Sequence, residues 1–156
     1  MRIRILGAAG AVALSLTLAG CASPIESIIE PQTDAEITTD GEGGLMVETD
    51  TGSVQAGSSV ELPADFPADH PVPAGRLVSA WASEGSWLLV FEDVALSEYE
   101  RMLAHYTSSR YEEILRTASS NINDHQMAVY ESTHWNVSVS WEDVRGGNLN
   151  YNVAAR

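Results

Sequence analysis

The aromatic residues are confined to the second part of the chain, and this confinement limits where a folded core can form. All 11 lie between Phe66 and Tyr151 of the 156 residues, whereas residues 22–60 carry eight acidic residues, no basic residue and no aromatic residue. Burial in such a segment cannot offset the entropy that is lost on ordering it. We therefore predict a folded domain over residues 61–156, preceded by an acidic, disordered tether over residues 21–60. A random coil of that length spans on the order of 35 Å.

Residues 1–20 have the pattern of an export signal. Arg2 and Arg4 precede an uncharged stretch from Ile5 to Gly20. This stretch is shorter than the ~20 apolar residues that a membrane-spanning helix needs. A short positive region followed by an apolar run is typical of a signal peptide that is later removed. Because the positive end stays inside, we predict that the rest of the chain is exported.

The end of this stretch, Leu18-Ala19-Gly20-Cys21, resembles the lipobox of bacterial lipoproteins. The resemblance implies that a signal peptidase recognises Leu18, Ala19 and Gly20 and cleaves before Cys21. The Cys21 thiol then carries a diacylglyceryl group with palmitate-type chains, which anchors the protein to the cell membrane, facing outside the cytoplasm. Cys21 is the one cysteine of the chain, which excludes an internal disulfide and a cysteine-based zinc site. The alternative is an ordinary secreted protein with an incidental cysteine.

Apolar periodicity in the second part of the chain predicts six strands and one helix. In residues 86–92, apolar side chains occupy both faces, which is typical of a central strand. Ser97-Glu98-Tyr99-Glu100 has the form of a capping box, and Tyr99, Met102, Leu103 and Tyr106 follow it as one apolar stripe. The predicted elements are strands at 76–82 and 86–92, a helix from 97 to about 109, and strands at 111–117, 125–131, 134–141 and 148–153.

The predicted order ββαββββ with short links favours an α+β fold of two layers. One helix packs on an antiparallel sheet of about five or six strands, and the disordered tether precedes it. Within the sheet, Ser132-Thr133 reads as a two-residue turn. This turn would place Glu131 opposite His134 and His125 opposite Ser140.

Residues 63–73 contain four prolines, which forbid a helix and favour an extended segment. We expect Phe66 and Val72 to pin this segment onto the core. The alternative is a proline-rich ligand for an aromatic groove. The patterns Leu62-Pro63-x-x-Phe66-Pro67 and Val72-Pro73-x-Gly75 resemble small, uncharacterised lipoproteins of Gram-positive bacteria of the high-GC type, as do the single helix and the alternating last strands. The resemblance carries over no catalytic residue, and His70 stands where that pattern has a small apolar residue.

The charge and motif content excludes several functions. A net charge of -14 and a pI of 4.4 argue against binding to nucleic acid, which needs a basic surface. We expect the four histidines, His70, His105, His125 and His134, to be solvated and to hold no metal or other cofactor. No nucleophile elbow or phosphate-binding glycine loop is found in the sequence. We therefore predict that the protein is not an enzyme.

Polar residues alternate with apolar ones in the last strands and predict a polar sheet face. Rows of amides and hydroxyls are suited to hydrogen-bond sugars or a peptide, and we expect no aromatic side chain on this face. The alternative is that this face is only the water-facing side of a two-layer fold. The candidate binding residues are Glu131, His134, Asn136, Ser138, Ser140, Asn148, Asn150 and Asn152.

These features predict a membrane-anchored, extracytoplasmic lipoprotein of unknown biochemical activity. Its expected role is that of a non-enzymatic binding or interaction module of the cell envelope. The expected partners are the membrane, through the lipid on Cys21, and an envelope protein or a cell-wall component. The alternatives are an envelope enzyme with an unrecognised active site and a structural subunit of a membrane complex.

Overall fold

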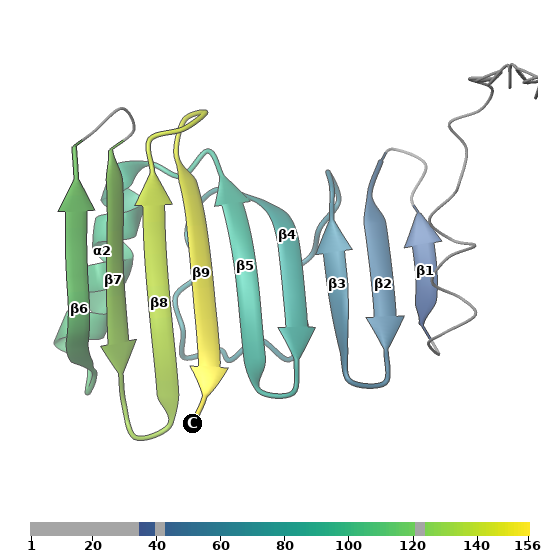
Figure 1. Ribbon diagram of the computed structural model, residues 1–156, viewed down its shortest axis with the longest axis horizontal. Helices are drawn as coiled ribbons and strands as arrows, with labels where there is room; N and C mark the ends of the chain where they lie inside the picture. Colours follow the sequence, from purple (N-terminus) through teal and green to yellow (C-terminus); the bar gives the residue numbers. More distant parts are fainter. Residues whose placement is uncertain (1–34, 40–42, 121–123) are drawn as a thin grey trace, which may run out of the picture.

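The computed structural model describes residues 35–39, 43–120 and 124–156, and its main feature is one antiparallel sheet of nine strands (Figure 1). The strands lie side by side in the order β1-β2-β3-β4-β5-β9-β8-β7-β6. None of the described helices is long and apolar enough to cross a membrane. In chain order the elements are β1 (Glu36–Thr39), β2 (Leu45–Thr49), β3 (Gly52–Ala56), β4 (Arg76–Ser83), β5 (Ser86–Glu92), α2 (Leu96–Ser108), β6 (Glu112–Ser119), β7 (His125–Glu131), β8 (Trp135–Glu142) and β9 (Asn148–Ala155).

The nine-stranded sheet shows that the prediction of one helix on five or six strands was wrong. The order ββαββββ is present from β4 to β9, and the predicted ranges of β5 and β7 match those of the structure. Three further strands, β1 to β3, lie within the segment for which we predicted a disordered tether. They extend the sheet beyond β4, so that four strands instead of one lie on that side of β5 (Figure 1).

The sequence did not predict the strands β1 to β3, because these strands form without burying side chains in the core. None of their described residues is buried. They pair through their backbones, and apolar side chains face each other across the strands: Ile37 opposite Val47, Val47 opposite Val54, and Val54 opposite Trp81. An edge strand gains hydrogen bonds and such cross-strand contacts from a sheet that already exists. The burial of side chains alone therefore underestimates the stability of such an edge strand.

The core lies on one face of the sheet, beneath α2. The chain crosses from β5 through α2 to the far edge at β6, and the strands β7, β8 and β9 return toward β5, so that α2 lies behind the β6–β8 end of the sheet (Figure 1). The predicted helical stripe of Tyr99, Met102, Leu103 and Tyr106 is buried, as expected. The sheet contributes Ala80, Ala82, Trp87, Leu89, Phe91, Ala128, Tyr130, Val137, Val139, Trp141, Leu149, Tyr151 and Val153 to this core.

The proline-rich segment covers the part of the core that α2 does not reach. Phe66 is buried and meets Trp87 and Tyr151 edge to face, with ring centroids 6.1 and 6.0 Å away. Trp87 Nε1 donates a hydrogen bond to Asp65 Oδ1 at 3.1 Å. Val72, which we expected to pin the segment, is exposed instead. The segment is thus bound by its own chain, mainly through Phe66.

The helix begins one residue before the predicted capping box and does not use it. Ala95 is the N-cap residue and forms no side-chain hydrogen bond to the helix. The Glu98 carboxylate instead accepts hydrogen bonds from Arg101 at 2.9 Å and from the Ala74 backbone at 3.0 Å. These two bonds, that from Arg101 first, lower the pKa of Glu98. Glu98 therefore ties the proline-rich segment to the helix instead of capping it.

Candidate functional site

The sheet face opposite α2, here called the open face, carries no second layer among the described residues. Because side chains alternate along a strand, residues between the buried ones of β8 and β9 point to this face. The register pairs Ser138 with Asn152 and Ser140 with Asn150. Seven of the eight predicted binding residues come together here: Glu131, Asn136, Ser138, Ser140, Asn148, Asn150 and Asn152.

His134 is the exception, because the pairing of β7 with β8 differs by two residues from the prediction. Glu131 lies opposite Asn136, not His134, and His125 lies opposite Glu142, not Ser140. A loop that starts at Ser132 replaces the two-residue turn, and Ser132 N donates to the Trp135 carbonyl at 2.8 Å. His134 therefore lies in this loop, off the face. A shift of two keeps every other side chain on its predicted face.

An aromatic side chain does lie on the open face, contrary to the prediction. Trp81 of β4 is 39% exposed and lies directly opposite Leu88 of β5. Leu88 lies opposite Asn152, which lies opposite Ser138. One straight row across four strands thus joins an exposed indole to the amide and hydroxyl residues. The two-residue turn Glu84-Gly85 sets the pairing of β4 with β5. A turn of that length, recognised in the sequence, would have placed Trp81 opposite Leu88.

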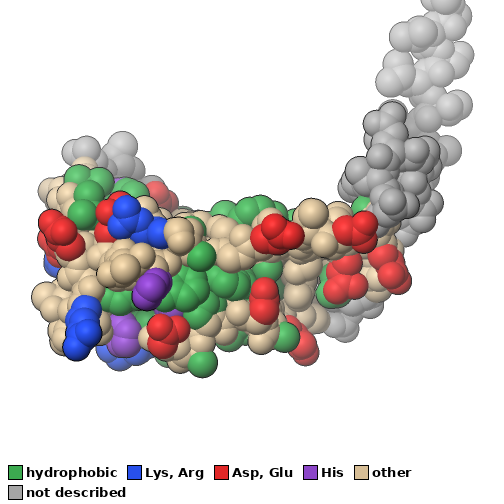
Figure 2. Space-filling view, turned by 90° about the horizontal axis from the view of Figure 1, so that it is seen from below, with side chains coloured by type: hydrophobic (Ala, Val, Ile, Leu, Met, Phe, Trp, Pro, Cys, Tyr) green, Lys and Arg blue, Asp and Glu red, His purple; other side chains and the backbone are tan. Residues whose placement is uncertain are grey.

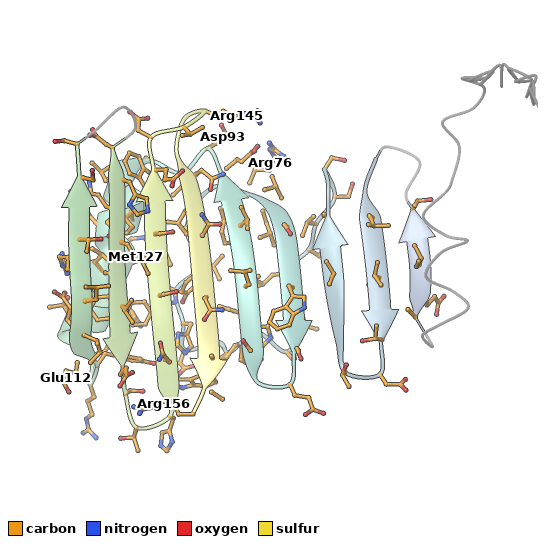
Figure 3. All side chains as sticks on the ribbon, viewed as in Figure 1. Arg76, Asp93, Glu112, Met127, Arg145 and Arg156 are labelled. Atoms are coloured by element: carbon orange, nitrogen blue, oxygen red, sulfur yellow. The ribbon has the colours of Figure 1, made fainter. Side chains whose placement is uncertain are left out.

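The middle of the open face carries no charge. A second row runs beside the first and contains Ser79, Val90, Asn150, Ser140 and Met127. Charged residues lie at the two ends of the strands: Figure 3 shows Arg76, Asp93 and Arg145 at one end and Glu112 and Arg156 at the other, with Met127 between them.

Most of the charged groups at these ends pair with one another. Arg76 binds Glu92, and Arg145 lies 4.0 Å from the same carboxylate. At the other end Arg156 binds Glu131 at 3.1 Å. An uncharged band therefore crosses the sheet between two rims of paired charges.

Several polar side chains in this band are free to bind a ligand. Asn150 Nδ2 lies 3.4 Å from Asn148 Oδ1, a long hydrogen bond. Among the described residues, the side chains of Ser138, Ser140 and Asn152 have no hydrogen-bond partner. Each carries both a donor and an acceptor. The band can therefore satisfy groups that donate and accept at the same time.

A shallow hollow of about 180 Å³ lies beside Trp81, over the strands β2 to β4. The residues that line it include Trp81, Val54, Thr49, Thr51 and Ser83, and the Thr49 hydroxyl donates a hydrogen bond to the Gly52 carbonyl at 3.0 Å. It is smaller than the pockets that enclose drug-sized ligands. One aromatic residue and three hydroxyl-bearing residues thus line a space for one small ring.

The charge of the molecule is uneven from end to end. Residues 35–75 hold eight acidic residues and no arginine or lysine. In the view along the strands, arginine side chains are seen only in the half of the molecule that carries α2, and acidic side chains are seen at both ends (Figure 2). Among the described residues, the strands β1 to β3 hold two acidic residues, Glu36 and Glu48, and no basic one.

A second cluster of chemically active groups lies in the core around His70. We predicted a solvated histidine here, but His70 is only 4% exposed. Its Nδ1 lies 2.9 Å from the Tyr106 hydroxyl, which also bonds the Tyr151 hydroxyl. Its Nε2 is buried with no hydrogen-bond partner among the described residues. The Trp135 ring lies edge to face against it, with centroids 5.0 Å apart.

Burial is the main cause of the pKa shifts in this cluster. Desolvation lowers the pKa of His70, the neighbouring Asp69 partly opposes this, and His105 adds to it. Desolvation also raises the pKa values of Tyr106 and Tyr151. Burial therefore favours the neutral form of His70, which joins the proline-rich segment to Tyr106 of α2, and Tyr106 in turn bonds Tyr151 of β9.

Two further predictions concern metal binding and the lipid attachment site. Within the described ranges, no three His, Cys, Asp or Glu side chains are grouped closely enough to hold a metal ion. Leu18, Ala19, Gly20 and Cys21 lie outside the described residues. No family model, no curated protein and no solved structure matches the chain significantly.

Proposed function

We propose that this protein is a lipoprotein of the cell envelope, anchored through Cys21 at the outer side of the cell membrane, that binds an envelope component through its open face. The observation that carries the binding role is the row from Trp81 through Leu88 to Asn152 and Ser138. Its polar groups are spread over several strands and do not converge on one point. This arrangement favours a binding protein over an enzyme.

The added strands support a position close to the membrane. Between Cys21 and the start of β1 at Glu36 lie the 14 residues 22–35. A chain extends by at most about 3.6 Å per residue, so β1 stays within about 50 Å of the anchored cysteine. The open face is then presented near the membrane surface, where a high local concentration allows a weak interface to suffice.

Site-specific photo-crosslinking in native membranes tests this function. A benzophenone amino acid replaces Leu88 on the open face or, as the matched control, Leu96 at the start of α2, which is exposed to a similar extent. We expect adducts with an envelope component from position 88 and not from position 96. Equal yields at both positions, or no adduct from position 88, would contradict the proposal.

A further inference from the structure

We propose that the open face binds a neutral, hydroxyl-rich polysaccharide, laid across the strands from the hollow beside Trp81 to Asn152 and Ser138. This inference rests on the proposed function, because it names the ligand class for the same face. It follows from the charge, the hydrogen-bonding groups and the shape of the uncharged band.

The distribution of charge indicates a neutral ligand. The two central rows contain no ionisable side chain, although the protein as a whole has a net charge of -14. An acidic polymer would be repelled by this charge and would find no cation in the band. A basic ligand would be drawn to the carboxylates at the ends of the strands instead of to the middle.

The hydrogen-bonding groups match hydroxyls. Asn152, Ser138 and Ser140 each present donors and acceptors that no described residue occupies. Sugar hydroxyls also donate and accept, so they can satisfy these groups. An apolar partner, such as a second copy docked through its Val54–Trp81–Leu88 row, would bury the amides without partners at a cost in affinity.

Trp81 provides the flat surface that a sugar ring needs. Trp81, which is exposed, lines the hollow together with the hydroxyl-bearing residues Thr49, Thr51 and Ser83. The C–H face of a sugar ring packs against an aromatic face, while the ring hydroxyls point outward to polar groups. The hollow suits one ring of a chain that continues over Leu88.

The extent of the band indicates a chain of several sugars. Its residues come from β3, β4, β5, β9 and β8, which are consecutive in the sheet. Neighbouring strands lie about 4.8 Å apart, so the path from Val54 to Ser138 is about 19 Å long. A single small sugar would contact only one part of this path.

Binding to immobilised wall polymers tests the ligand class. Full-length protein extracted in detergent is incubated with the neutral polysaccharide fraction of the native cell wall and, separately, with its acidic polymers. We expect retention on the neutral fraction only. Trp81→Ala should weaken binding about tenfold or more, since it removes the aromatic contact. Asn152→Ala should weaken it several-fold, and Trp81→Phe should retain part of it.

The control variant and the other outcomes separate the ligand class from the binding role. Ile114→Ala changes an exposed apolar residue of β6 outside the band and should leave retention unchanged. Retention on the acidic polymers, or dimerisation that depends on Trp81, would overturn the polysaccharide inference and leave the binding role of the face intact. If the protein is not retained on the neutral fraction and position 88 also gives no adduct, both proposals fail.

Discussion

The Nδ1 atom of His70 lies 2.9 Å from the Tyr106 hydroxyl in the middle of the core, and this contact joins the proline-rich segment to α2. Asp69, His105, Tyr106 and Tyr111 are the titratable groups that surround the imidazole. Because Nε2 has no partner among the described residues, protonation would place in an aromatic environment a charge that Asp69 compensates only in part.

This burial predicts a loss of stability on mild acidification. Burial lowers the pKa of His70 in the folded protein, whereas an unfolded histidine titrates near 6.5. Protons therefore bind the unfolded chain first, and stability falls as the pH drops below about 6.5, down to the folded pKa. His70→Asn removes this effect, so the free energy of unfolding of the wild type should fall by about 1 kcal/mol more than that of the variant between pH 7.5 and 5.5. Urea unfolding at both pH values measures it.

His134→Asn, which removes an exposed histidine from the β7–β8 loop, is the matched control for that experiment. If His70→Asn and His134→Asn give the same pH profile, the burial of His70 does not govern the acid sensitivity.

Trp141 should contribute more to stability than Trp81, although both lie in the sheet. Trp141 is buried, and its Nε1 donates a hydrogen bond to the Val94 carbonyl at 2.8 Å, which holds the β5–α2 connection against β8. Trp141→Phe leaves that carbonyl unpaired and should cost roughly 1–3 kcal/mol of unfolding free energy. Trp81→Phe should stay within about 0.5 kcal/mol, because Trp81 is exposed. Chemical denaturation measures the free energy of unfolding of both variants, and equal decreases would contradict the structure.

Substitution by alanine should destabilise the protein to different extents at two glycines that both have positive φ, because only one of them packs on the β5–α2 connection. A Cβ at Gly147, with φ of 106°, would lie 1.9 Å from the Val94 carbonyl oxygen, whereas a Cβ at Gly43, with φ of 92°, would meet nothing within 4 Å. Gly43→Ala should therefore cost only the backbone strain, about 1–2 kcal/mol. Gly147→Ala should cost about 3 kcal/mol or more. Similar thermal unfolding of both variants would argue against this packing of the β8–β9 loop on Val94.

One substitution should disrupt the pairing of β3 with β4 and leave the core intact. A Cβ on Gly52 would lie 2.2 Å from the Ala82 carbonyl oxygen, so Gly52→Ala must push β3 away from β4. Amide hydrogen exchange in β1 to β3 should then accelerate toward the rate of an unstructured chain, while β8 and β9 keep their protection. In the wild type, the β3 amides should exchange slowly. Exchange at the unstructured rate in the wild type would mean that β1–β3 do not belong to the sheet.

The sequence predicted the elements that build the core better than the rest of the fold. Strict alternation in β8 and β9 and the helical stripe from Tyr99 to Tyr106 reflect burial on one side, so the pattern shows them directly. Strands β1 to β3 bury nothing, and their acidic, aromatic-free composition resembles that of a disordered chain. Their pairing depends on the exposed edge of β4, which exists only in the folded protein.

The candidate site could be predicted only in part, for a related reason. Alternation placed the amides and hydroxyls of β8 and β9 on one face without knowledge of the register. To include Trp81 in the site, the order of the strands had to be known, because β4 and β9 are far apart in the sequence and are joined only through β5. His70 also carried no local signal, since its burial results from Tyr106 and Trp135, which belong to other elements.

Oxidative footprinting of Trp81 tests the binding role of the open face most directly. Hydroxyl radicals label exposed side chains, and mass spectrometry compares labelling in intact native envelopes with that in the protein extracted from them. We predict that Trp81 is strongly protected in the envelope, whereas Ile114 at the β6 edge is labelled equally in both samples. Equal labelling of Trp81 in both samples would show that nothing covers this face in the cell.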